Sequence, residues 1–172
     1  MSETVPHSIN PKSAWREVAR VGLHKRSTAE RLADFLEIYG PYDEETARAQ
    51  ASRCVQCPDP LCVTGCPLGN RISEWLALTA EGKFSEAAAI LYSTSSLPEI
   101  ASRVCPSDRM CESRCILQGK AEPVSIWAIE QFLTEYAFVH GEAQAPVAAP
   151  NGWRVAVIGA GPGGLTCADV LS

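Results

Sequence analysis

The sequence predicts a mainly α-helical domain followed by the first strand, turn and helix of a second, Rossmann-like domain. Three observations lead to this prediction. Apolar residues recur at helical spacing, seven of the eight cysteines gather in two short groups, and a strand, a glycine turn and a helix follow near the end. We place the helical domain at residues 1–140, a linker at 141–152 and the incomplete second domain at 153–172.

The charge and hydropathy of the chain narrow the class of protein. Its 172 residues include 15 basic and 20 acidic side chains, with no block of like charge, so we expect no nucleic-acid partner and no membrane partner. We also see neither a secretory signal nor an apolar run long enough to cross a bilayer. These features predict a cytoplasmic protein. In that reducing compartment, eight cysteines favour metal binding or redox chemistry over disulfides.

Two helices are predicted before the cysteines. The first lies within residues 26–41, with Ser27 or Thr28 as its N-cap and a Gly-Pro pair as its stop. Four apolar residues in it recur at helical spacing: Leu32, Phe35, Leu36 and Tyr39. Asp43 can cap the second helix, which covers residues 44–53 and leads into the first cysteine group. Nothing reactive clusters in this region, so we interpret both helices as a packing scaffold.

Helical patterns continue between and after the cysteine groups. Two short helices are predicted after Pro67, with a break near Gly82 and an end before Pro98, and Ser85 is a candidate cap for the second of them. A longer helix is predicted over residues 125–140. The linker that follows is marked by its alanine, proline and glycine content.

The spacing of the cysteines points to iron–sulfur clusters. The first group reads C-x2-C-x4-C-x3-C-P, and the second reads C-P-x4-C-x3-C. Bacterial two-cluster ferredoxins use a four-cysteine run that ends in proline, in which three cysteines hold one 4Fe–4S cluster and the fourth binds the other. We therefore predict a ferredoxin-type domain with two 4Fe–4S clusters. Seven cysteines are candidate ligands: Cys54, Cys57, Cys62, Cys66, Cys105, Cys111 and Cys115.

Two such clusters need eight ligands, and the eighth is open at this stage. Cys167 lies in the second domain, so it is a poor candidate. Glu130 lies at the edge of the apolar face of the helix over 125–140, where a carboxylate is costly unless it is paired or bound to metal. Glu130 is therefore a candidate ligand. The alternative is a salt bridge to Arg103 or Arg114.

Zinc is the competing metal for these thiols. Structural zinc sites join two short pairs of ligands through a longer loop into a closed tetrahedron. Here three spacings run together, and seven cysteines do not divide into tetrahedral sites, so the spacing favours iron–sulfur clusters.

The glycine turn near the end predicts a cofactor site. It follows an apolar strand at 154–158 and opens a helix, and the residues predicted to contact a dinucleotide are Gly159, Ala160, Gly161, Pro162, Gly163 and Gly164. Glycines at these positions permit the tight turn, the approach of a pyrophosphate and close packing of strand and helix. The rest of a βαβ unit lies past Ser172, so we expect a longer protein and no tight dinucleotide binding by this chain alone.

The motifs together resemble the small-subunit family of NADPH-dependent glutamate synthase. Related segments occur at the N-terminus of dihydropyrimidine dehydrogenase and in flavoprotein subunits of electron-bifurcating transhydrogenases. The resemblance is carried by the stretches over 47–72, 97–115, 124–132 and 155–165. It implies a helical domain with two 4Fe–4S clusters, followed by FAD-binding and NAD(P)H-binding domains in the full-length protein.

The resemblance also implies how the ligands divide between the clusters. One cluster would be held by Cys54, Cys57, Cys62 and Cys115. The other would be held by Cys66, Cys105, Cys111 and Glu130.

The activity implied by the resemblance is electron transfer in an NAD(P)H-dependent oxidoreductase. Electrons would pass from NADPH through FAD and the two clusters to a large catalytic subunit that forms glutamate. We do not expect this chain to be catalytic by itself. The alternatives are a subunit of a pyrimidine-reducing or transhydrogenase enzyme, and a zinc-stabilised interaction module.

Overall fold

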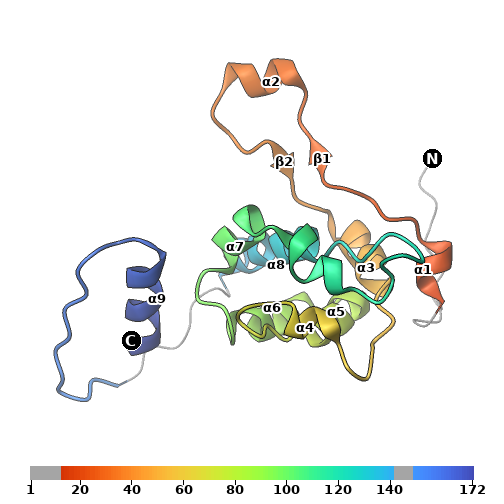
Figure 1. Cartoon of the computed structure of the whole chain (residues 1–172). Coiled ribbons are helices and arrows are strands. Elements are labelled where there is room, and N and C mark those ends of the chain that lie inside the picture. Colours follow the sequence, from red (N-terminus) through yellow and green to blue (C-terminus); the bar gives the residue numbers. More distant parts are fainter. Residues whose placement is uncertain (1–12, 142–148) are drawn as a thin grey trace.

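The computed structural model describes residues 13–141 and 149–172 and is mainly α-helical there, as predicted (Figure 1). The helices are α1 Ala14–Glu17, α2 Thr28–Ala33, α3 Glu44–Ser52, α4 Leu61–Thr64, α5 Ile72–Glu81, α6 Phe84–Tyr92, α7 Pro98–Val104, α8 Ile126–Val139 and α9 Pro162–Leu171. Two 3₁₀ turns, η1 Ser107–Arg109 and η2 Glu112–Arg114, lie between α7 and α8. Two short antiparallel strands, β1 His24–Lys25 and β2 Tyr39–Gly40, complete the described elements.

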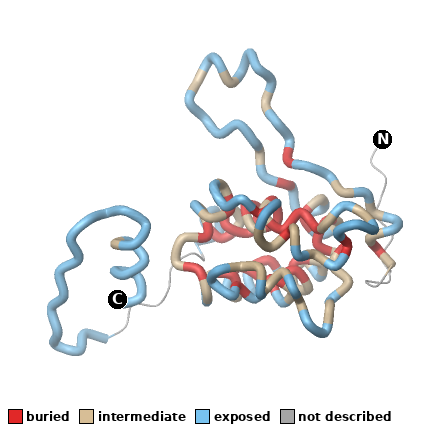
Figure 2. The backbone as a smooth tube through the Cα atoms, in the orientation of Figure 1, coloured by how far each residue is buried: buried red, intermediate tan, exposed pale blue. Residues whose placement is uncertain are grey.

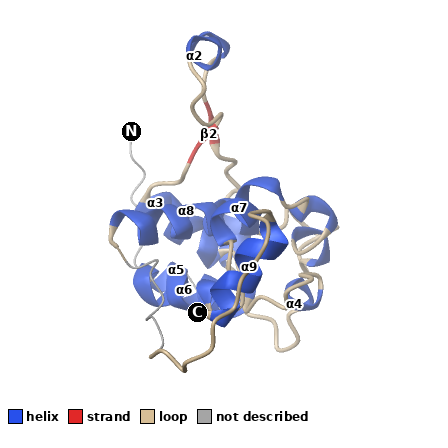
Figure 3. Ribbon diagram, turned by 90° about the vertical axis from the view of Figure 1, so that its left-hand side faces the viewer, coloured by secondary structure: helices blue, strands red, loops and turns tan. Residues whose placement is uncertain are grey.

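The body of the molecule consists of two layers of helices. Helices α3, α7 and α8 lie over α5 and α6 in both views (Figures 1 and 3), with α8 packed against α6 and α3 packed against α5. Buried residues line the space between the layers (Figure 2). The largest fully buried apolar side chains are Trp75, Leu76, Leu91, Ile126, Ile129 and Leu133. Burial of such side chains is the main stabilising contribution to the body.

Several predicted helix ends are confirmed. The Ser27 hydroxyl accepts a hydrogen bond from the Glu30 N–H, and the Glu30 carboxylate accepts one from the Ser27 N–H, which makes a capping box. Asp43 caps α3 by accepting the Thr46 N–H at 2.7 Å. Gly82 ends α5 in the left-handed conformation, with φ of 80°. The predicted cap at Ser85 is wrong, because α6 already begins at Phe84 and Ser85 lies inside its first turn.

The helix predicted over 26–41 is wrong beyond Ala33. The Asp34 carboxylate accepts two hydrogen bonds from the Arg26 guanidinium, at 3.0 and 2.5 Å, and also accepts the Leu36 N–H at 2.9 Å. These contacts compete with helical hydrogen bonding and hold Asp34 in an extended conformation. The chain then turns back, and β2 pairs with β1.

The result is an arm, residues 22–41, that projects from the body (Figures 1 and 2). Its apolar side chains lie in solvent: Leu32 is 82% exposed, Phe35 109% and Leu36 71%. The helical spacing of these apolar residues therefore does not indicate a buried helix face. The arm contacts the body near its base, where Tyr39 meets Trp127 edge to face with a ring separation of 6.2 Å and Glu37 pairs with Arg103.

Three of the described helices, α1, α4 and α7, were not predicted. Pro98 was expected to follow the end of a helix, but it occupies the first turn of α7, where its missing N–H leaves no hydrogen bond unmade. The short helix α4 lies within the first cysteine group. The predicted helix over 125–140 is confirmed as α8.

The C-terminal part shows the predicted helix but not the predicted strand. Residues 154–158 have no regular secondary structure, and within 13–141 and 149–172 no strand pairs with them. Gly164 lies so close to Gly159 that a Cβ atom on it would stand 2.0 Å from the Gly159 carbonyl oxygen, as expected of the third glycine in such a turn. The Rossmann-like domain stays a prediction, as do the domain boundaries, and residues 142–148 of the linker lie outside the described residues.

Across the parts of the chain that the structure describes, no helix combines the length and the apolar character needed to cross a bilayer.

Because Phe35 is exposed and Leu133 is fully buried, substitutions at the two positions should affect stability differently. We expect Phe35→Ser to change the free energy of unfolding by no more than about 0.5 kcal/mol. The control variant Leu133→Ala should lower it by about 2–5 kcal/mol, because it leaves a cavity in the core. Chemical denaturation followed by circular dichroism measures both. Equal destabilisation by the two variants would show that the arm packs on the body.

Candidate metal centre

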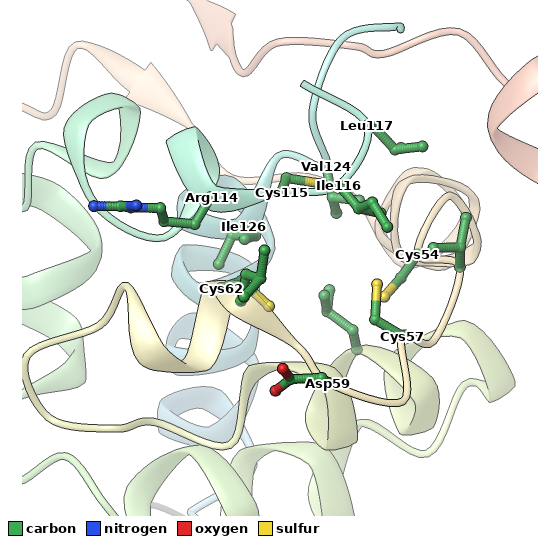
Figure 4. A pocket seen from close by; sticks show the side chains of 13 residues that line it. Cys54, Cys57, Asp59, Cys62, Arg114, Cys115, Ile116, Leu117, Val124 and Ile126 are labelled. Atoms are coloured by element: carbon green, nitrogen blue, oxygen red, sulfur yellow. The ribbon is translucent and has the colours of Figure 1, made fainter. Parts of the chain in front are cut away.

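Four cysteines from three segments of the chain line one cavity (Figure 4). Cys54 and Cys57 lie on the loop after α3, Cys62 lies in α4, and Cys115 follows η2. The space between the lining residues, counted out to the solvent at its mouth, is about 450 Å³. Apolar side chains, including Leu76, form much of the remaining wall. This is the first of the two ligand sets that the family resemblance implied.

Local backbone geometry brings these thiols together. Gln56, between Cys54 and Cys57, has φ of 52°, and within the described residues no other non-glycine residue has a positive φ. This left-handed conformation bends the short loop, so that the thiols on either side of it face the cavity (Figure 4). The buried Arg53 holds the start of the loop by donating to the carbonyl oxygens of Val18 and Glu122.

Gly65 allows the two cysteine groups to meet. A Cβ atom at Gly65 would lie 2.7 Å from the Cγ atom of Arg114 and 3.1 Å from the carbonyl oxygen of Met110. Only glycine therefore permits this close approach of the turn after α4 to the segment around η2. Cys62 and Cys66 flank this turn, and Cys111 and Cys115 flank η2.

The second implied set also gathers at one region. Cys66 follows α4, Cys105 follows α7, Cys111 precedes η2, and Glu130 lies on α8. Burial raises the pKa of Cys105 and of Cys111, and the nearby charges of Glu130 and Cys66 raise both further. Cys105 is exposed, so this set lies at the surface of the body on that side.

The environment of both sets opposes negative charge. Burial and neighbouring thiols raise the pKa of Cys54 to about 11 and that of Cys62 to about 12, and burial raises the pKa of Cys111 to about 12. A cationic group bound between these thiols would favour their deprotonation. A metal cluster is such a group, and it deprotonates the cysteines that bind it.

Glu130 has no cationic partner in the described residues. Burial raises the pKa of its carboxyl group to about 8. The predicted alternative, a salt bridge to Arg103 or Arg114, does not form there, because Arg103 pairs with Glu37 and Glu135 instead. A partly buried carboxylate beside two cysteines and without an ion pair fits a metal ligand.

Within the described residues, neither set is arranged as a site for a single ion. Over residues 13–141 and 149–172, no three His, Cys, Asp or Glu side chains lie close enough to hold a single metal ion. A tetrahedral zinc ion, with Zn–S bonds of about 2.3 Å, needs its ligands in a closed cage around one point. Here the four thiols surround a cavity instead. All eight cysteines, each within the described residues, are free, so the sets are not disulfides.

The glycine turn and Cys167 lie elsewhere. Residues 159–164 form the turn before α9, and Gly161 is the N-cap residue of that helix. Nearly all of residues 149–172 are exposed, and the structure does not bring the turn or Cys167 to either cysteine set.

The sequence analysis missed two charged residues near the cysteines. Asp59 lines the cavity beside Cys57 (Figure 4), and Glu112 is buried between Cys111 and Cys115. Neither residue fits a ligand spacing or a helical period. The one sequence signal available was the position of each between predicted ligands.

Comparison with known proteins identifies relatives that share most of the chain. The family model described as dihydropyrimidine dehydrogenase domain II, 4Fe-4S cluster, matches residues 31–142. The glutamate synthase (NADPH) small chain of Escherichia coli K12 is 43% identical over 157 residues, covering 91% of this chain and 33% of that protein. The protein of the same name from Halomonas elongata is 43% identical over 166 residues, covering 95% and 35%. That from Azospirillum brasilense is 41% identical over 149 residues, covering 86% and 31%.

The chain thus spans about a third of the length of these relatives. Both cysteine groups and Glu130 lie inside the matched residues 31–142.

The raised pKa of Glu130 predicts a pH dependence of stability in metal-free protein. Between its ordinary value of 4.5 and about 8, the folded chain binds a proton that the unfolded chain releases. The contribution of this carboxyl group to the free energy of unfolding is therefore greatest at low pH. It falls as the pH rises from about 4.5 toward 8, by up to about 1.4 kcal/mol per pH unit. Glu130→Gln cannot titrate, so it should lack this loss in urea unfolding between about pH 5 and pH 8. Parallel pH profiles for the two proteins would show that Glu130 is solvated.

Proposed function

Because this chain belongs to the family of dihydropyrimidine dehydrogenase domain II, 4Fe-4S cluster, we propose that its two ligand sets hold two 4Fe–4S clusters. The chain is an iron–sulfur domain of the kind found in glutamate synthase small chains. The observation that carries the proposal is the gathering of eight candidate ligands into two sets of four, one around a cavity and one at the surface.

The residues of each set have distinct roles in this proposal. Cys54, Cys57, Cys62 and Cys115 hold the first cluster, and Cys66, Cys105, Cys111 and Glu130 hold the second. Each cluster, when bound, accepts and releases one electron at a time. The apolar wall of the cavity limits access of water to the first cluster, and burial of this kind is one of the factors that set a cluster potential.

The two clusters differ in ligand type and in exposure. The first set consists of four partly buried thiols, whereas the second contains the exposed Cys105 and a carboxylate in place of one thiol. Ligand identity and solvent exposure both tune the potential. We therefore expect the two clusters to have different potentials.

The whole protein extends this relay at both ends. We propose that the glycine turn at 159–164 opens an FAD-binding domain, and that NAD(P)H supplies electrons to this flavin. The large subunit of a glutamate synthase then accepts them. The names of the three relatives support this assignment, and so does the close approach of Gly164 to Gly159. The name of the matching family model favours a pyrimidine-reducing enzyme as the second candidate.

Metal analysis of anaerobically purified protein tests the proposal. We expect about eight iron and eight sulfide per chain, with a broad brown absorption band. Cys57→Ala should lose about half of both, because it removes a ligand of one cluster only. Cys167→Ala is the matched control: it removes an exposed thiol outside both sets and should keep about eight iron. One or two zinc ions and no sulfide would instead show a structural zinc module.

A further inference from the structure

A buried acidic residue lies on the segment that joins the two ligand sets. Glu112 is only 3% exposed and occupies η2, between Cys111 of the second set and Cys115 of the first. It belongs to neither set. Burying a carboxylate is unfavourable unless hydrogen bonds or a cation compensate its charge. The contacts of Glu112 therefore indicate its structural role.

Glu112 binds two other parts of the chain. One carboxylate oxygen forms an ion pair with the Arg20 guanidinium at 2.7 Å. The other oxygen accepts the backbone N–H of Trp127, in the first turn of α8, at 3.2 Å. Ser125, the N-cap residue of α8, makes no capping hydrogen bond with its side chain, and its hydroxyl instead accepts a hydrogen bond from Arg20 at 2.7 Å. Glu112 therefore caps α8 from another element.

The capped helix carries the one non-cysteine ligand. Glu130 lies three residues after Trp127, about one helical turn along α8. A shift of the helix N-terminus relative to η2 would therefore move Glu130 relative to Cys111. A movement of η2 would also move Cys115 relative to the first cavity, because only three residues separate Cys115 from Cys111.

We propose that Glu112 is a positioning residue that fixes the two ligand sets relative to one another, by fastening the segment between Cys111 and Cys115 to the N-terminus of the helix that carries Glu130. The inference rests on the proposed function, because it concerns the placement of the clusters. Arg20 completes the clamp by binding both Glu112 and Ser125.

Two variants at Glu112 and one control test the inference. Glu112→Gln keeps an oxygen that can accept the Trp127 N–H but loses the ion pair with Arg20, and Glu112→Ala loses both contacts. Glu74→Gln is the control, because Glu74 forms an exposed ion pair with Arg71 at the start of α5 and belongs to neither set. The readouts are iron per chain, the magnetic interaction between the two reduced clusters in electron paramagnetic resonance, and helicity by circular dichroism.

We expect Glu74→Gln to match the unchanged protein in all three readouts. Glu112→Gln should keep about eight iron and native helicity but show a changed magnetic interaction, which depends steeply on the separation of the clusters. Glu112→Ala should lose the cluster that includes Glu130, so that iron falls to about four per chain. A loss of stability alone would lower the iron content or the helicity of Glu112→Gln and would not change the magnetic interaction while both stay native.

Other results would overturn the inference. If Glu112→Ala keeps eight iron and the same magnetic interaction as the unchanged protein, other contacts position the sets, while the proposed function stands. If Glu112→Ala loses both clusters together with its helicity, Glu112 stabilises the fold in general and not the placement of the sets. Absence of iron from the unchanged protein would overturn the proposed function and this inference with it.

Discussion

The proposed two-cluster arrangement depends on one covalent constraint: Cys111 and Cys115 are separated by three residues and belong to different candidate ligand sets. The sets must therefore be neighbours, and the segments that supply their other members must converge on η2. The loop after α3 and the turn after α4 converge there, as do the end of α7 and the N-terminal half of α8. Gly65 is part of the same constraint, because any side chain at this position would separate α4 from η2.

Bringing these titratable side chains together in a buried site is unfavourable by itself. Packing in the rest of the body compensates for this cost. Burial raises the pKa of Cys54, Cys62, Cys111 and Glu130, which means that the site disfavours the charged forms that bind metal. The two layers of helices bury their apolar side chains beside the site and hold it in place. In the proposed function, a bound cluster would supply positive charge that favours the thiolates and so offsets this cost.

Local signals in the sequence were sufficient for many elements but not for contacts across long separations. Asp43 and its helix were predictable, because a cap and its N–H group lie three residues apart. The end of α2 was not, since it depends on Asp34 binding Arg26 across the arm. The cysteines were recognisable by their spacing, and the sets into which they gather agree with the family resemblance. The contacts of Glu112 were not predictable, because its partner Arg20 lies 92 residues away in the sequence.

The most direct test of the two-set account is to remove each of the two adjacent thiols in turn and identify the cluster that remains. Cys115→Ala should leave the same electron paramagnetic resonance signal as Cys57→Ala, because both variants lose the first cluster. Cys111→Ala should leave the other signal, the same as that of Cys105→Ala, because both lose the second. If Cys111→Ala and Cys115→Ala leave the same signal, the two thiols serve one cluster, and the division of ligands is wrong.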